Sequence, residues 1–201
     1  MDPLKISQES VEKDLALVEE IDLSKRYKIL GIQKQGDLYT FDFFNRQIVF
    51  MENDFKDLDG KIVTLALKTV LLKYMVMCPD KLVKSDNRLV TFRELSNGSP
   101  LFSSFTANTA KTIENTFSNQ IDLLKLQCQK LGVDPIASNG FDLSVRFRAL
   151  PRVPIILNFN DQDDGMPAQA SFLYHGNANT FLDLTALGII CTYLTGLLIQ
   201  N

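Results

Sequence analysis

Hydrophobic positions in the first third of the chain follow a helical pattern, then a strand pattern, then a helical pattern again. Over residues 8–21 they recur every three or four positions, which predicts an amphipathic helix. Residues 27–54 are rich in β-forming side chains and are interrupted at Gly36–Asp37 and Asn45–Arg46, which predicts a three-stranded meander. Residues 60–77 are apolar nearly all round, so they predict a largely buried helix that ends ahead of a proline.

The middle of the chain predicts one extended segment and a long helical region. The extended segment is LVTFREL at residues 89–95, and Asn97–Gly98 predicts a turn after it. Apolar residues recur at helical spacing over residues 108–131, with Gly132 as the C-terminal stop. The sequence SNQID at residues 118–122 can restart the helix, so one long helix and two shorter helices both stay open.

The last third of the chain predicts strands followed by a helix. Residues 142–150, 153–160 and 168–176 have the composition of three strands. Residues 181–200 are apolar and predict a buried helix. The proline pair Pro151 and Pro154 cannot donate backbone hydrogen bonds, which predicts that the second of these strands lies at a sheet edge or beside an opening.

These elements predict an α+β fold class, with antiparallel sheets and packed helices in a single domain over residues 1–201. The order helix, three strands, helix occurs over residues 8–77 and again over residues 108–200, which suggests an internal pseudo-repeat. Two such halves could form one continuous antiparallel sheet or face each other across a groove.

Composition narrows the classes of partner and compartment. The net charge is −3, and neither nucleic acid nor an anionic membrane is expected as the main partner of such a chain. The first twenty residues lack the pattern of a secretory signal. The apolar C-terminal stretch is at the short limit for a membrane span and has no flanking Lys or Arg, which favours a core helix.

The cysteines and the single histidine predict no metal or cofactor site. Cys78, Cys128 and Cys191 are far apart and form no C-x-x-C pair, so they encode neither a zinc knuckle nor an iron–sulfur ligand set. Their odd number and spacing favour a reducing compartment, and the expected location is cytoplasmic. His175 has no histidine partner and no nucleophile motif near it, so we expect it to be structural or exposed.

The acidic sequence NDQDDG has two interpretations. Asp161, Asp163 and Asp164 could supply oxygen ligands to a hard cation such as calcium, but the later positions of an EF-hand loop are missing. Asp, Asn and Gly are also favoured in turns. The sequence therefore favours a plain hairpin tip over a metal site.

Two arginines in apolar surroundings are the strongest candidates for a ligand site. Arg93 and Arg152 each need an anionic or carbonyl partner, and Glu94 and Asp161 are available nearby in sequence. One interpretation is internal ion pairs between these residues. The other is an anion-binding pocket, with all four side chains gathered in a cleft.

Two long segments carry a resemblance to a known family. These are TFRELSNGSP at residues 91–100 and ALPRVPIILNFNDQDDGMPAQASFLYHGNANTFLDLTAL at residues 149–187. They resemble a prokaryotic domain family of unknown function, found mainly in anaerobic bacteria and archaea. Some of those relatives carry an added four-cysteine iron–sulfur module similar to that of corrinoid proteins in one-carbon metabolism. This chain has no such module.

The resemblance and the absence of catalytic motifs leave two functional classes open. The favoured class is a non-catalytic binding or accessory protein in anaerobic redox or one-carbon metabolism, with an iron–sulfur or corrinoid protein as its partner. The alternative is an enzyme or ligand sensor with an anion-binding pocket around Arg93 and Arg152.

Overall fold

The N-terminal part of the molecule begins with two helices. The computed structural model describes residues 6–84, 86–95, 98–137 and 140–200. Helix α1 (Gln8–Glu19) confirms the first prediction, and the Ser7 side chain caps it by accepting the N–H of Ser10. Helix α2 (Leu23–Leu30) was not predicted, and it replaces the start of the expected meander. The side chain of Asp22 caps its first turn by accepting the N–H of Ser24. The start of this short helix is therefore set by a polar residue and not by the spacing of apolar residues.

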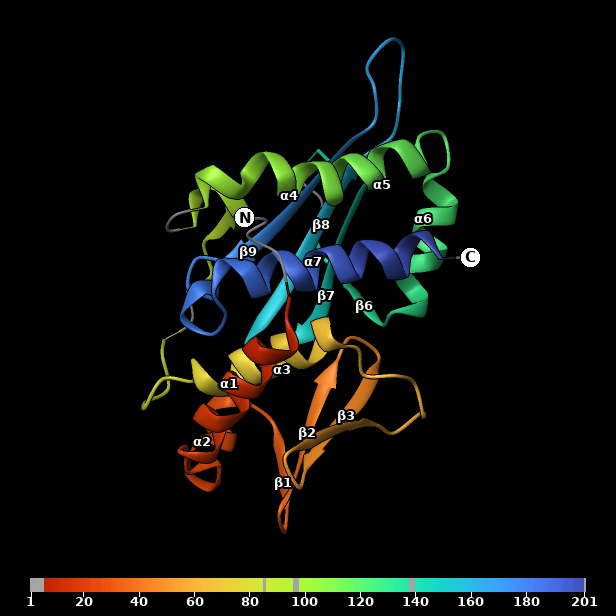
Figure 1. The fold of residues 1–201 in the computed structure, drawn as a ribbon. Helices are drawn as coiled ribbons and strands as arrows, with labels where there is room; N and C mark the ends of the chain where they lie inside the picture. The colour runs from red at the N-terminus through yellow and green to blue at the C-terminus, as the bar shows by residue number, and fades with distance from the viewer. Residues whose placement is uncertain (1–5, 85, 96–97, 138–139, 201) are drawn as a thin grey trace.

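A small antiparallel sheet follows, with its strands paired in chain order (Figure 1). Its strands are β1 (Gln33–Gln35), β2 (Leu38–Phe43), β3 (Arg46–Met51) and β4 (Asp54–Asp57). The three predicted strands are confirmed as β1, β2 and β3, and a fourth strand that was not predicted, β4, pairs with β3. Glu52 and Asn53 both have positive φ and make the tight turn that reverses the chain into β4.

Helix α3 (Leu65–Val76) confirms the predicted buried helix, but it begins five residues later than expected. Thr64 sets this start, because its side chain accepts the N–H of Leu67. The helix packs against α1 and α7. Lys73 of α3 forms an ion pair with the buried Asp14 of α1, at 2.8 Å between Nζ and Oδ1.

The second antiparallel sheet is the larger one, and its strand order in the described chain is β5-β9-β8-β7-β6. Its strands are β5 (Leu89–Thr91), β6 (Val133–Pro135), β7 (Leu143–Leu150), β8 (Val153–Asn160) and β9 (Gln169–His175). The three predicted strands correspond to β7, β8 and β9 and are confirmed. The extended segment at 89–95 is a strand only at its start, because its capping box turns the chain into the 3-10 helix η1 (Phe92–Glu94).

Helices cover one face of the larger sheet (Figure 1). They are α4 (Phe102–Asn108), α5 (Ala110–Phe117), α6 (Ile121–Lys130) and α7 (Leu184–Ile199), with short 3-10 turns η2 (Ser99–Leu101) and η3 (Ala178–Thr180). The break between α5 and α6 at residues 118–120 confirms the two-helix alternative. Of the predicted Asn97–Gly98 turn, Asn97 lies outside the described residues.

Helix α7 confirms the predicted core helix. It packs against α3, α4, α5 and α6, and Leu187, Ile190 and Leu194 are fully buried. In the described part of the chain, no helix combines the length and apolar character needed to cross a membrane.

The predicted α+β fold class is confirmed, whereas the internal pseudo-repeat is not. The strands form two separate sheets rather than one continuous sheet. The larger sheet also recruits β5 from the segment between the two proposed repeats.

The two sheets meet at a β-bulge. Regular pairing of β7 with β8 is interrupted between Phe147 and Leu150, opposite Pro154. Pro154 has no N–H to donate, and within this bulge the carbonyl of Arg148 accepts the N–H of Phe44 at 2.9 Å. This bond ties the β2–β3 turn to the larger sheet. The expectation of an edge strand was wrong, since β8 is central, and the bulge is what accommodates the proline.

Gly31, at the C-terminal end of α2, packs against the β7–β8 turn. It has a φ of +74°, and a Cβ here would lie 2.9 Å from the Cβ of Pro151 and 3.3 Å from Nε of Arg152. We expect Gly31→Ala to lower the free energy of unfolding by roughly 2–4 kcal/mol, through backbone strain plus overpacking. Gly36→Ala is the control, because Gly36 has a φ of +58° and open space around it. It should cost only about 1–2 kcal/mol. Urea unfolding measures both, and equal losses would contradict the close-packing argument.

Candidate functional site

A charged groove opens where the two sheets meet. Its volume is about 330 Å³, within the range of small-ligand sites. The uncharged wall comes from the α2 end and the β7–β8 turn, and consists of Gly31, Leu150, Pro151 and Pro154. The charged lining comes from three strands, and consists of Asp42, Asp134, Arg146 and Arg148. The opening predicted beside Pro151 and Pro154 is therefore present, although the arginines in it are not the predicted ones.

Strand alternation places the two arginines in this inter-sheet groove. Val145 and Phe147 of β7 face the core, so Arg146 and Arg148 point to the opposite face of the sheet. Asp134 of the edge strand β6 is the direct cross-strand neighbour of Arg146. A carboxylate beside two guanidinium groups on one sheet face is the expected result of this register.

Asp134 binds both arginines. Nη2 and Nε of Arg148 lie 2.6 Å and 3.1 Å from its two carboxylate oxygens, and Nη2 of Arg146 lies 3.4 Å away. The contact with Arg148 is bidentate, the geometry by which arginine recognises carboxylate and phosphate groups. The hydrogen bond from Arg148 holds the pKa of the Asp134 carboxyl below its ordinary value, although partial desolvation opposes this.

Asp42 approaches the groove from the small sheet. Its carboxylate accepts a hydrogen bond from Nε2 of Gln47 at 3.2 Å and adds a second negative charge near Arg148. The side chains that line the groove are therefore two carboxylates, two guanidinium groups and an apolar wall. Such a set of groups can bind and orient a charged ligand.

The predicted site residue Arg152 lies behind the apolar wall of the groove. Its Nε and Nη2 donate to the carbonyls of Ile29 and Lys28, at 2.8 Å and 3.0 Å. These carbonyls belong to the last turn of α2, so Arg152 satisfies acceptors that a helix C-terminus leaves free. Its backbone N–H donates to the hydroxyl of Tyr74.

Arg93 and Glu94 lie together on η1 but make separate contacts. Arg93 is exposed, with its guanidinium 5.9 Å from the ring centre of Phe102. Glu94 accepts hydrogen bonds from the N–H and hydroxyl of Thr91, both at 2.8 Å. These bonds from Thr91 lower the pKa of the Glu94 carboxyl.

Asp161 directly follows β8 and connects it to the start of α6. Its carboxylate accepts the N–H groups of Asn119 and Ile121, at 2.6 Å and 3.3 Å. It therefore serves as a cap for α6 from a distant strand.

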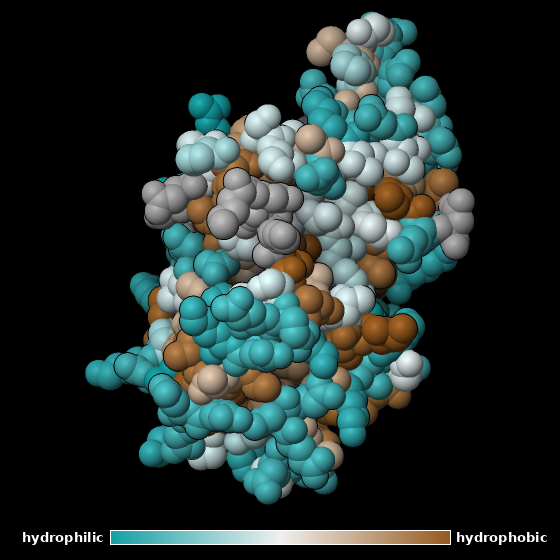
Figure 2. Space-filling view, in the orientation of Figure 1, coloured by the Kyte–Doolittle hydropathy of each residue, from teal (hydrophilic) through white to brown (hydrophobic). Residues whose placement is uncertain are grey.

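The acidic segment beyond Asp161 is the tip of the β8–β9 hairpin, as predicted. Asp163 and Met166 exchange backbone hydrogen bonds, and Asp164 and Gly165 between them both have positive φ. The hairpin projects from the body of the molecule (Figure 1), and the space-filling view shows it as mainly hydrophilic (Figure 2). Across the described residues, no group of three or more acidic, His or Cys side chains is arranged to hold a metal ion.

The predicted salt bridges of the arginines are therefore not formed. Among the described residues, neither Arg93 nor Arg152 forms an ion pair with Glu94 or Asp161. Backbone and hydroxyl groups satisfy three of the four side chains instead. A role for these four residues in ligand binding stays a prediction. Arg146 and Arg148 were not predicted as site residues, although their alternation with Val145 and Phe147 in VRFR indicates a charged strand face.

The thiols are poor nucleophiles in this fold. Burial raises the pKa of Cys78 to about 11 and that of Cys128 to about 12, and it raises the pKa of Cys191 further. All three cysteines are buried and protonated at neutral pH. His175 ends β9, where burial and the nearby charge of Arg146 lower its pKa.

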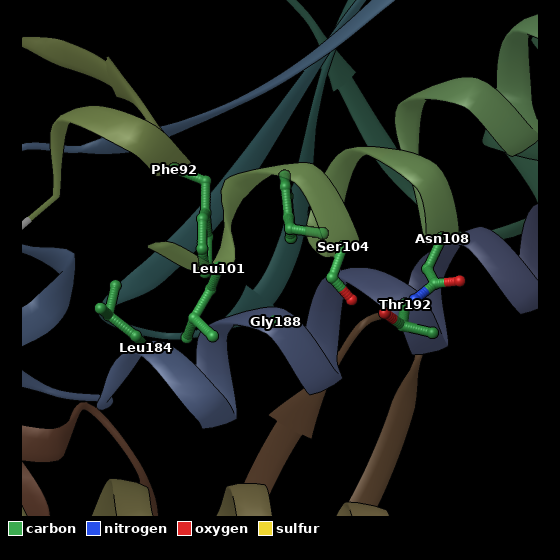
Figure 3. Close-up of a pocket in the computed structure, with 8 residues that line it drawn as sticks. Phe92, Leu101, Ser104, Asn108, Leu184, Gly188 and Thr192 are labelled. Carbon is green, nitrogen blue, oxygen red and sulfur yellow. The ribbon is translucent and has the colours of Figure 1, made fainter. Parts of the chain in front are cut away.

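A narrow cavity between α4 and α7 is less suited to a ligand than the groove (Figure 3). Its volume is about 20 Å³, enough for about one water molecule. Phe92, Leu101, Phe105 and Leu184 make it largely apolar, and the first and third of these stack at 4.2 Å between ring centres. It is a small gap between the two helices, bordered by the exposed residues Ser104 and Asn108.

The molecule is an α+β domain with a charged groove at the junction of two antiparallel sheets. The chain belongs to the family described as a domain of unknown function, DUF3786, whose model matches residues 22–196. This range includes every residue that lines the groove. Neither a curated protein nor a solved structure matches the chain.

Proposed function

We propose that this domain is a non-catalytic binding or accessory protein and that its partner engages the inter-sheet groove. The observation that carries the proposal is the composition of the groove, where two exposed guanidinium groups and two carboxylates stand against a rigid proline wall. Fixed charges of both signs in a preformed groove favour specific recognition. The protonation of the buried thiols further supports binding over nucleophilic chemistry.

The partner class that we propose is an iron–sulfur or corrinoid protein of anaerobic redox or one-carbon metabolism. The support for this class is the resemblance to relatives in which a similar domain is fused to a four-cysteine iron–sulfur module. In this proposal the module binds the domain as a separate protein. A surface that carries acidic groups around such a cluster would complement Arg146 and Arg148.

The test is a titration of the isotopically labelled chain with the four-cysteine module of those relatives, produced as a separate protein. We expect amide shift changes around the groove, at Gly31, Arg146 and Arg148. Arg148→Ala should weaken binding roughly tenfold, the effect of removing a contact worth more than 1 kcal/mol. Arg93→Ala is the matched control, because Arg93 is an exposed arginine outside the groove.

Each outcome of this titration has a distinct meaning. Loss of binding in Arg93→Ala but not in Arg148→Ala would reject the groove and support the site predicted from sequence. Absence of binding to both the module and a corrinoid protein would reject the proposed partner class. Chemical turnover of a partner-derived ligand by the purified chain would reject the non-catalytic assignment.

A further inference from the structure

The arginine pair in the groove already holds a carboxylate that belongs to the protein itself. Arg148 binds both oxygens of Asp134, and Arg146 adds a longer contact from the neighbouring position on the same face. A bidentate contact of this kind is the recognition geometry of an arginine for a carboxylate or phosphate of a ligand. The Asp134 carboxylate is therefore an example, from within the chain, of the type of group that the arginine pair binds.

The pair is accessible from solvent and has further donors. The side chains of Arg146 and Arg148 are 44% and 70% exposed, whereas that of Asp134 is 28% exposed. Among the described residues, Nη1 of each arginine and Nε of Arg146 form no hydrogen bond within the protein. Each guanidinium can thus bind an oxyanion that enters the groove, in addition to or in place of Asp134.

The strand that carries Asp134 has a single neighbour in the described part of its sheet. Strand β6 has three residues and lies at the edge of the sheet, paired only with β7 in the described chain. The contact between Asp134 and Arg148 is a solvent-accessible ion pair. Such pairs contribute only about 0–1 kcal/mol to the free energy of unfolding. An incoming oxyanion would therefore displace the Asp134 carboxylate at small cost.

We propose that Arg146 and Arg148 form a receptor for an oxyanion, a carboxylate or phosphate group of the ligand or partner, and that Asp134 is an internal competitor for it. This proposal rests on the groove being the binding site proposed above, and it names the chemical group recognised there. Asp134 offsets one of the two positive charges of the arginine pair in the free protein and lowers the affinity of the pair for anions that lack further contacts with the groove.

The test uses inorganic phosphate and succinate as probes, in low-salt buffer, with the arginine Nε–Hε resonances as the readout. We expect weak binding by the unaltered protein, with shifts at Arg148 and Arg146. Asp134→Asn should bind both probes about tenfold more tightly, since it removes a competing carboxylate and a like charge at contact distance. The gain should shrink as salt is raised. A preference for phosphate or for succinate in this variant identifies which oxyanion the site favours.

Matched variants separate this mechanism from a general charge effect. Asp122→Asn removes a carboxylate from an exposed ion pair with Lys125 on α6 and should leave anion affinity unchanged. Arg148→Lys keeps the positive charge but loses the bidentate fork, so it should lose most of the affinity gained by Asp134→Asn. Amide spectra of each variant verify the fold.

Two results would overturn the proposal. If Asp134→Asn and unaltered protein bind the probes equally, Asp134 is not a competitor and only stabilises the edge strand. If neither probe binds to any variant, the pair is not an oxyanion receptor. In both cases the proposed function survives when the partner titration still shifts the groove resonances, so the two failures are distinguishable.

Discussion

Ending the chain after Asp183 is expected to leave the protein unfolded. This truncation removes α7, whose side chains at Leu187, Ile190, Leu194 and Leu198 are fully buried among helices from both halves of the chain. Each of these side chains contributes roughly 2 kcal/mol of burial energy, and their sum is comparable to the whole stability of a typical domain. Circular dichroism and near-ultraviolet spectra of the truncated chain check the result. A soluble truncated protein with native-like spectra would contradict a core role for α7.

A single substitution gives a graded version of the same experiment. Leu194→Ala is expected to lower the free energy of unfolding by about 3 kcal/mol, within the usual range for a buried Leu→Ala change. Ile199→Ala, at the end of the same helix, removes a 38% exposed aliphatic side chain and should cost less than about 1 kcal/mol. Equal losses would show that helix length, rather than burial of one face, controls the stability of α7.

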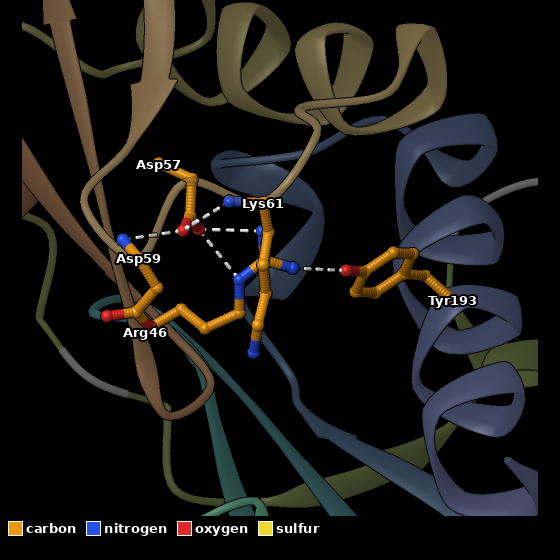
Figure 4. Close-up of polar contacts among 5 residues, drawn as sticks. All are labelled: Arg46, Asp57, Asp59, Lys61 and Tyr193. Atoms are coloured by element: carbon orange, nitrogen blue, oxygen red, sulfur yellow. Dashed lines mark hydrogen bonds and ion pairs between the residues drawn. The ribbon is translucent and has the colours of Figure 1, made fainter.

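Breaking the buried ion pair between Arg46 and Asp57 is the second change with a large expected effect. Nη2 and Nε of Arg46 lie 2.6 Å and 2.8 Å from the same Asp57 oxygen, and Nη1 donates to the Tyr193 hydroxyl of α7 at 2.6 Å (Figure 4). The other Asp57 oxygen accepts the N–H groups of Asp59 and Lys61. The side chains are 9% and 0% exposed, so Asp57→Asn leaves a buried guanidinium without its counter-charge. We expect a loss of about 3–5 kcal/mol, measured by urea unfolding.

Asp54→Asn is the control for this experiment, since it makes the same change in the same strand. Asp54 pairs with Lys68 at 2.6 Å, but its side chain is 52% exposed, so the loss should stay below about 1 kcal/mol. The pH dependence gives an independent check. Burial alone would raise the pKa of Asp57, but the bonds from Arg46, Lys61 and Asp59 outweigh it and hold that pKa below its ordinary value.

The sign of the pH effect follows from that depressed pKa. The ionised Asp57 stabilises the fold fully above the pKa of the unfolded chain, and this contribution is lost as the pH falls through the lower folded-state pKa. Unaltered protein should therefore lose stability over this acidic window, and Asp57→Asn should show a smaller loss there. Parallel stability curves for the two proteins would contradict this interpretation of the ion pair.

Local sequence patterns determined much of the secondary structure. Helices α1 and α7 and strands β7, β8 and β9 were predicted because the spacing of apolar side chains reports which face of each element is buried. The acidic hairpin tip followed from turn chemistry in the same way. Helix α2 and strand β4 were missed because each is short and is defined by a cap or a two-residue turn rather than by periodicity.

The roles of charged residues depended on segments that are distant in the sequence. Arg152 binds carbonyls of α2, and Asp161 caps α6, so each binds a segment that is distant from it in the sequence. An arginine in apolar surroundings must have an acceptor, but sequence cannot distinguish a carboxylate from a free helix carbonyl. The partner of such a side chain is decided by which helix end lies beside it in the folded protein.

The sequence by itself determined the α+β class, the buried C-terminal helix and the three strands β7, β8 and β9. Only the tertiary structure decided that Asp134 reaches Arg148, that Gly31 and Asp42 complete the groove, and that Arg46 is paired with Asp57 beneath α7. Periodicity is a local property, set by the geometry of one helix or strand. A site assembled from several elements depends on the register of strands and the meeting of two sheets, which no short stretch of sequence contains.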